Sequence, residues 1–191
     1  MMKYKRSKKT DYRKRLKLLK SGKIRLVIRR SHNNLHVQFV RYEFNGDKIL
    51  AEEISKNIKK YGWKAHCGNM PAAYLTGLLA GKKALEKGIG HCIIDIGMHV
   101  SNSSILYAVA KGVIDAGINV PLGFALKEER IKGLHIAEYA KLLKKDSERY
   151  KKQFSNYINA GLHPENLVQH LEDVKASILK SFPEKHVVEA K

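Results

Sequence analysis

The fold is decided by the stretch Ile24-Arg-Leu-Val-Ile-Arg-Arg-Ser-His-Asn-Asn-Leu-His-Val-Gln-Phe-Val40. In each half, apolar residues recur at every second position, the period of a strand that buries one face. Residues 30–34, between the halves, are polar and include two asparagines, which favour a turn. The stretch therefore predicts two antiparallel strands. The residues with this spacing are Ile24, Leu26, Ile28, Leu35, Val37 and Phe39.

A third strand is predicted directly after this pair. Asn45-Gly46-Asp47 is a turn signal, and an apolar and polar mixture follows it at 48–54. The three strands form an antiparallel meander whose aliphatic face must lie on a core. We expect the other face, which carries Arg25, Arg29, His36 and Gln38, to be open to solvent or to a partner.

Beyond the meander, helical and strand patterns alternate. Asn69 and Pro71 are suited to begin a helix that continues with leucines at helical spacing to Gly88. A buried strand is predicted at 92–96, a second helix at 103–115 and a short strand at 118–120. Such alternation favours parallel pairing. The predicted fold is α/β: a mixed sheet with an antiparallel meander followed by βαβ units, and helices on one face.

The chain divides into three regions by composition: a basic arm at 1–22, an α/β core at 23–122 and a helical C-terminal extension at 123–191. Charged helices are predicted in the extension at about 133–145, 147–158 and 164–181. We expect these helices to form an extension of the core and not a second catalytic domain.

The charge of the chain is strongly positive, with 37 Lys and Arg against 18 Asp and Glu. Fourteen of the basic residues lie in the first 30 positions, where Asp11 is the one acid. A basic arm before a nearly balanced body is the usual layout of a nucleic-acid-binding protein. Because residues 3–23 include only three leucines, we expect this segment to be largely disordered until it meets phosphates.

Membrane insertion is excluded by the absence of a long apolar segment. No run approaches the roughly 18 apolar residues that a membrane-spanning helix needs. The basic start is not followed by the apolar segment of a secretory signal. We therefore expect no membrane partner and a cytoplasmic location.

Signals for catalysis and for cofactors are weak. Gly77-Leu-Leu-Ala-Gly81-Lys-Lys83 resembles a phosphate-binding loop, but it has three residues between the glycines where that loop has four, and it falls inside a predicted helix. Asp95, His99 and Ser101 would suit a hydrolase, yet the chain has no nucleophile elbow. We expect neither enzymatic activity nor an organic cofactor.

The two cysteines, Cys67 and Cys92, each adjoin a histidine but lie 25 positions apart, without a C-x-x-C pair. This spacing favours buried, reduced thiols over a zinc site or a disulfide. The histidines also lack ligand spacing, so no metal is expected.

Several blocks of the sequence match one family. The most specific are Pro71-Ala-Ala-Tyr-Leu-Thr-Gly77 and Lys151-Lys-Gln-Phe-Ser155. Others are Thr10-Asp-Tyr-Arg-Lys-Arg15, Lys60-Tyr-Gly-Trp-Lys64 and Ala110-Lys-Gly-Val-Ile-Asp-Ala-Gly117. In these blocks the chain resembles the archaeal form of large-subunit ribosomal protein eighteen, a family similar to the 5S-rRNA-binding ribosomal protein five of eukaryotes.

This resemblance implies a structural constituent of the large ribosomal subunit, which binds 5S rRNA and helps to attach it beside 23S rRNA. It also implies neighbouring large-subunit proteins as partners, including the other 5S-binding protein, and no small-molecule substrate. Two alternatives remain open: a non-ribosomal RNA-binding or RNA-processing factor, and a small hydrolase that uses Asp95 and His99.

The residues expected to bind RNA come from the arm, the polar face of the sheet and the loops beside it. Basic groups contact phosphates, aromatic rings stack on unpaired bases, and amides and hydroxyls form hydrogen bonds. The set is Lys3, Tyr4, Lys5, Arg6, Lys8, Lys9, Tyr12, Arg13, Lys14, Arg15, Lys23, Arg25, Arg29, Arg30, Ser31, Asn33, Asn34, His36, Gln38, Trp63, Lys64, Asn69, His99, Ser101, Asn102 and Ser103.

One loop departs from the family's pattern. After His99 the family usually shows Pro-Thr and a glycine followed by arginine, whereas this chain has Val100-Ser-Asn-Ser-Ser104, with no basic residue. An RNA contact here would have to use hydroxyls, Asn102 or the N-terminus of the next helix.

Overall fold

The sheet consists of the predicted meander and one added strand. The computed structural model describes residues 10–99, 103–123 and 127–182. In it, β1 (Arg25–Arg30), β2 (Leu35–Glu43), β3 (Gly46–Ile54) and β4 (Ile93–Asp95) form a four-stranded sheet in the order β3-β2-β1-β4. β2 is antiparallel to β1 and β3, and β4 is parallel to β1. The predicted mixed α/β sheet is thereby confirmed.

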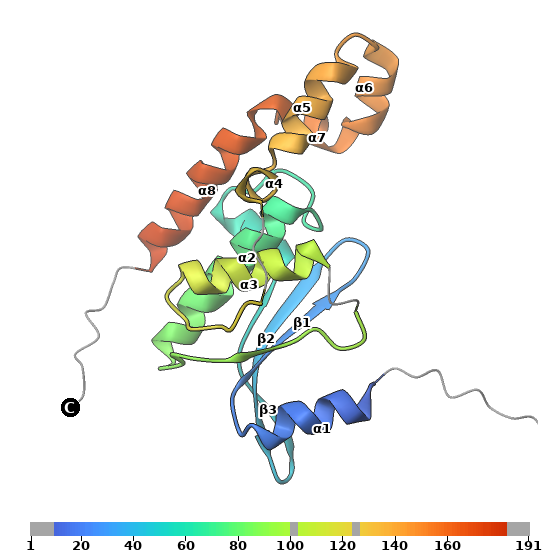
Figure 1. The fold of residues 1–191 in the computed structure, drawn as a ribbon. Coiled ribbons are helices and arrows are strands. Elements are labelled where there is room, and N and C mark those ends of the chain that lie inside the picture. Colours follow the sequence, from blue (N-terminus) through green and yellow to red (C-terminus); the bar gives the residue numbers. More distant parts are fainter. Residues whose placement is uncertain (1–9, 100–102, 124–126, 183–191) are drawn as a thin grey trace, which may run out of the picture.

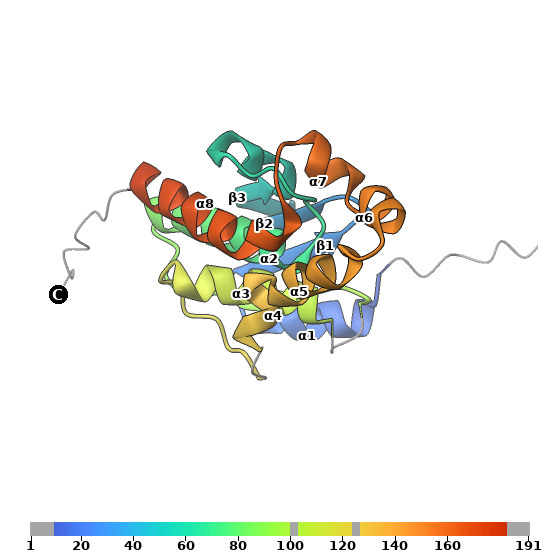
Figure 2. The ribbon, with the colours of Figure 1, turned by 90° about the horizontal axis from the view of Figure 1, so that it is seen from above.

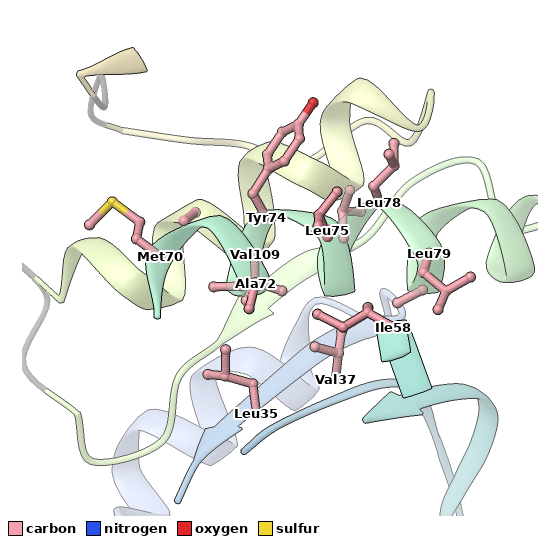
Figure 3. Close-up of a cluster of buried hydrophobic side chains, with 14 of the residues drawn as sticks. Leu35, Val37, Ile58, Met70, Ala72, Tyr74, Leu75, Leu78, Leu79 and Val109 are labelled. Atoms are coloured by element: carbon pink, nitrogen blue, oxygen red, sulfur yellow. The ribbon is translucent and has the colours of Figure 1, made fainter. Parts of the chain in front are cut away.

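Two helices, α2 (Met70–Glu86) and α3 (Ser104–Asp115), pack against the sheet and against each other in the core. α2 begins where predicted, because the Asn69 side chain accepts a hydrogen bond of 2.9 Å from the Ala72 N–H and a proline occupies the first turn. Leu35, Val37 and Ile58 are fully buried and face α2 in Figure 3. The alternation of the strands thus places one side-chain row of β2 in the core.

The backbones of α2 and α3 touch at two glycines. A Cβ atom on Gly77 would lie 2.0 Å from the Val109 carbonyl oxygen, and one on Gly112 would lie 2.2 Å from the Tyr74 carbonyl oxygen. Only glycine permits so close an approach. The stretch 77–83, which resembles a phosphate-binding loop in sequence, is therefore part of α2 and packs against α3.

A helix in the basic arm was not anticipated. α1 (Tyr12–Lys20) begins at Asp11, whose side chain accepts from the Lys14 N–H at 3.1 Å. Arg15 pairs with Asp47 at 2.8 Å, and the Lys14 Nζ donates to the Gly97 carbonyl oxygen. The expected disorder of the arm is therefore wrong over this segment, because tertiary contacts stabilise a stretch with little apolar surface of its own. Residues 3–9 lie outside the described residues.

Other differences from the sequence expectations are local. The strand expected at 118–120 is reduced to a single bridge between His91 and Asn119. A 3-10 helix, Ser55–Tyr61, and a short helix, α4 (Glu128–Lys132), were not anticipated. Both are too short to give a clear helical period in the sequence.

The C-terminal region is helical, as predicted. It contains α5 (Leu134–Leu143), α6 (Ser147–Gln153), α7 (Ser155–Asn159), a 3-10 turn at Pro164–Asn166 and α8 (Leu167–Ser181). The helix expected at 147–158 is divided at the buried Phe154. Figure 1 places α5, α6 and α7 at the opposite end of the molecule from α1, and Figure 2 shows α8 lying over α2, which it contacts.

His170 joins α8 to the α/β core. Its ring stacks on Trp63, with centroids 5.2 Å apart, and its Nε2 accepts from the Lys64 backbone N–H at 3.1 Å. Burial lowers the pKa of His170, and the charge of Lys64 lowers it further, whereas Asp173 acts in the opposite direction. The contact requires a neutral ring, because a protonated Nε2 cannot accept a hydrogen bond.

Replacing Gly77 by Ala should destabilise the protein by about 2 kcal/mol or more, since the added Cβ overlaps the α3 backbone. Helix propensity alone predicts the opposite sign, a gain of about 1 kcal/mol. Chemical denaturation measures the difference. Gly90→Ala is the matched control, because nothing lies within 4 Å of its Cβ position, and it should stay within about 0.5 kcal/mol of wild type. A Gly77→Ala protein as stable as wild type would refute the close contact.

Acidification should weaken the native state partly through His170. Its folded pKa is below the ordinary value of about 6.5, so the unfolded chain takes up the proton first as the pH falls. The stabilisation is present above about pH 6.5 and is lost as the pH falls through the lower, folded pKa. His170→Gln should therefore lose less stability than wild type between about pH 7.5 and 5. His163→Gln, a change at an exposed position, is the control. Parallel pH curves for wild type and His170→Gln would contradict this role.

Candidate nucleic-acid interface

A chain of ion pairs lies on the polar face of the sheet. At its centre is Arg25, whose side chain is 2% exposed and donates to Asp95 at 3.1 Å and to Asp47 at 2.7 Å. Asp47 also pairs with Arg15 of α1, and Asp95 pairs with Arg29 at 3.1 Å. These pairs connect α1, the β2–β3 hairpin, β1 and β4.

Asp95 is fully engaged in this network. Its Oδ2 accepts from Arg25, and its Oδ1 accepts from Arg29 and from the Gly97 N–H. Burial acts to raise the pKa of Asp95, but the Arg29 charge, the Gly97 hydrogen bond and the Arg25 charge outweigh it, so the pKa lies below its ordinary value. An ionised carboxylate held by two guanidinium groups positions arginines and is poorly suited to act as a general base.

A hollow of about 440 Å³ lies between α1 and the loop that follows β4. Lys14, Arg15, Arg29 and His99 contribute to its lining, together with Asp95. The Arg29 side chain is 45% exposed there and bonds the Asp95 carbonyl oxygen through Nη1. Cationic groups fixed around an open hollow are suited to bind a phosphate group.

Most of the residues that were predicted to bind RNA, and that the structure describes, have exposed or half-buried side chains. They lie near this hollow or at the β1–β2 turn. Tyr12 and Arg13 are exposed on α1, and Lys23 is exposed before β1. The turn is closed by the Ser31 N–H, which donates to the Asn34 carbonyl oxygen at 2.8 Å. Exposed residues at or beside the turn are Arg30, Ser31, Asn33 and His36, while Asn34 and Gln38 are half-buried.

Two predicted residues are buried. The expectation that Arg25 faces solvent is wrong, since its side chain lies among carboxylates. Trp63 is 2% exposed and stacks on His170 instead of facing a partner.

The remaining predicted residues lie elsewhere. Lys64 is exposed, Asn69 caps α2, and Ser103 stands at the N-cap of α3 without a side-chain cap bond. Outside the described residues lie Lys3, Tyr4, Lys5, Arg6, Lys8, Lys9, Ser101 and Asn102. Sequence reasoning missed Asp47, although its place in the Asn45-Gly46-Asp47 turn, beside a face with two arginines, was a usable signal.

Neither a metal site nor a membrane-spanning helix occurs in the described ranges. There, no three His, Cys, Asp or Glu side chains are placed to hold a metal ion, and no helix is both long and apolar enough to cross a bilayer. Cys67 and Cys92 are free and buried, as predicted, and burial raises the pKa of Cys92 to about 12.

Known proteins resemble this chain over most of its length. Residues 1–91 match the family described as "Ribosomal large subunit proteins 60S L5, and 50S L18". The chain is also 48% identical, over 177 residues, to the "Large ribosomal subunit protein uL18" of the archaeon Methanococcus maripaludis. That similarity covers 91% of this chain and 92% of the relative.

Truncation of Arg25 should cost stability, not only binding. Arg25→Ala removes the buried partner of Asp95 and Asp47, and breaking a buried pair typically costs about 3–5 kcal/mol. Because Arg29 still contacts Asp95, we expect a loss near the lower end, measured by denaturant unfolding. Arg30→Ala, at an exposed neighbouring position, should change stability by less than about 0.5 kcal/mol. Equal stabilities of the two variants would exclude a structural role for Arg25.

Proposed function

The chain belongs to the uL18 family of large-subunit ribosomal proteins, and on this premise we propose that it binds 5S rRNA and helps to attach it to the subunit beside 23S rRNA. Members of this family are structural components of the cytoplasmic ribosome and not enzymes. The partners proposed for this chain are the two RNAs and adjoining large-subunit proteins, including the other 5S-binding protein.

The observation that carries the proposal is the ion-pair chain through Arg25. It holds the exposed Arg29 directly, and the elements that it connects, α1 and β1, also carry the exposed Arg13 and Arg30. Arg29 uses Nη1 and Nη2 to hold the backbone and carboxylate of Asp95, which fixes the direction of its guanidinium. A fixed cation loses less side-chain entropy when it meets a phosphate.

The surface also offers groups that could distinguish RNA features. Tyr12, which is 77% exposed, is available for stacking on an unpaired base, and Asn33 and His36 provide hydrogen-bonding groups. In this proposal the basic residues set affinity and position, while the aromatic and amide groups contribute selectivity. Residues 3–9 would add further phosphate contacts through Lys3, Lys5, Arg6, Lys8 and Lys9.

The test replaces two exposed arginines that make no ion pair within the described residues, Arg13 and Arg30, by Gln. Affinity for 5S rRNA should fall, and the log–log salt slope should decrease by about 0.7–0.9 for each phosphate that is no longer neutralised. Arg130→Gln with Lys180→Gln removes two exposed charges elsewhere and is the matched control. One result would exclude this surface as the binding site for 5S rRNA. In it, the double variant of Arg13 and Arg30 unfolds at the same temperature as wild type and also keeps its affinity and salt slope.

Binding to isolated RNA does not separate a ribosomal protein from an RNA-processing factor. Sedimentation of cell extract in moderate salt does so, because a structural component stays with the large subunit. We expect the chain in the large-subunit fractions. Release into the soluble fractions would favour the RNA-processing alternative. Weaker binding to 5S rRNA than to a tRNA competitor would contradict 5S rRNA as the partner.

A further inference from the structure

A second hollow of about 440 Å³ lies at the C-terminal end of the molecule, between α5, α6, α7 and the segment before α2. Aromatic rings form part of its lining: Phe154 and Tyr157 are buried, and Tyr139 is 47% exposed. The Phe154 and Tyr157 rings meet edge to face at 5.7 Å, and Tyr139 lies 6.2 Å from Phe154. The buried rings hold Tyr139 in a position from which one face can stack on a planar ligand.

The polar lining of this hollow is rich in amide groups. Gln153 and Asn156 are exposed, and no side-chain hydrogen bond is formed by either within the described ranges. Asn69 lies deeper, where its Nδ2 donates to the Tyr157 hydroxyl at 3.3 Å. Amides present a donor beside an acceptor, and nucleobase edges carry the same pairing.

The segment that leads into the lining of the hollow is rich in basic residues. Residues 141–152 contain six Lys or Arg against two acids. Lys151 and Lys152, which immediately precede Gln153, are exposed and form no ion pair in the part of the chain that the structure describes. Exposed lysines next in sequence to an aromatic and amide lining favour a nucleotide over an apolar peptide.

The hollow also adjoins the interface proposed above. His66 lines it and accepts a hydrogen bond from the Gly68 N–H at Nδ1, which leaves the proton on Nε2. That Nε2 lies 3.5 Å from the Asn33 side-chain oxygen in the β1–β2 turn. The hollow therefore lies beside the β1–β2 turn of the proposed interface.

We propose that this hollow binds one unpaired RNA nucleotide, whose base stacks on Tyr139 and whose edge meets Asn156 and Gln153. The adjacent phosphates contact Lys151 and Lys152. The inference rests on the proposed function in taking RNA as the polymer, but it uses none of the α1 and sheet residues. RNA then contacts the C-terminal helices as well as α1, which lie at opposite ends of the molecule in Figure 1.

The test measures binding of short unstructured oligoribonucleotides of uridine or adenosine to the full chain at raised salt, where stacking persists and purely ionic binding is screened. Tyr139→Ala should weaken binding by about ten-fold or more, the usual effect of removing one base-stacking ring. Tyr139→Phe should retain most of the affinity, and Tyr42→Ala, at an equally exposed tyrosine of β2, should behave as wild type. Asn156→Ala, at an exposed position, provides a second variant that does not depend on the aromatic packing.

The outcomes separate this inference from the proposed function. If wild type binds 5S rRNA but Tyr139→Ala and Asn156→Ala bind the oligoribonucleotides as wild type does, the hollow is not a nucleotide site. If wild type does not bind 5S rRNA, the proposed function fails instead. Photo-cross-linking of large subunits should attach a nucleotide to a peptide that contains Tyr139 or Tyr157. Cross-links from those peptides to a neighbouring protein alone would overturn the inference in favour of a protein ligand.

Discussion

The arrangement of the polar sheet face depends on one buried guanidinium, that of Arg25. Transferring an ion out of water costs several kcal/mol, and the cost is offset only where partners and geometry are good. Asp95 and Asp47 supply those partners from positions 70 and 22 residues away along the chain. The compensation is incomplete, because the buried Arg25 Nε has no hydrogen-bond partner among the residues that the structure describes. Such a site tolerates little rearrangement, so β4, the β2–β3 hairpin and α1 are held in one geometry around it.

The sequence predicts those parts of the fold that follow from local periodicity. The alternation around Leu26 and Val37 identifies two strands, and Asn69 with Pro71 identifies the start of α2, because each signal is contained within a few residues. The burial of Arg25 could not be predicted in this way, since it is determined by carboxylates distant in sequence. α1 escaped prediction for the same reason: its composition indicates a solvated arm, and its contacts with Asp47 and Gly97 are tertiary.

The candidate site shows the same division. The exposure of Arg13 and Arg30 follows from their charge and from their places in the arm and beside the β1–β2 turn. Trp63 shows where composition alone misleads. An aromatic ring beside a lysine is as well suited to stack on a histidine of the same chain as on a base, and here it stacks on His170. The hollow on the C-terminal helices could not be inferred at all, because its lining comes from segments near residues 66–69, 135–139 and 153–157. No local pattern brings those segments together.

α2 joins the two candidate RNA-binding sites, the C-terminal hollow and the polar face of the sheet, through rigid contacts at its two ends. Its 17 residues span about 26 Å. Asn69, at its start, bonds Tyr157 in the C-terminal hollow, and Lys87, just past its end, donates to the Leu50 carbonyl oxygen of β3, the strand that carries Asp47. The glycine contacts with α3 and the His170–Trp63 stack prevent the helices from shifting against the sheet. The distance between the two ends is therefore set by rigid elements and not by a linker. A protein with this construction can hold two RNA segments at a fixed separation, which is the physical requirement for attaching one folded RNA to another.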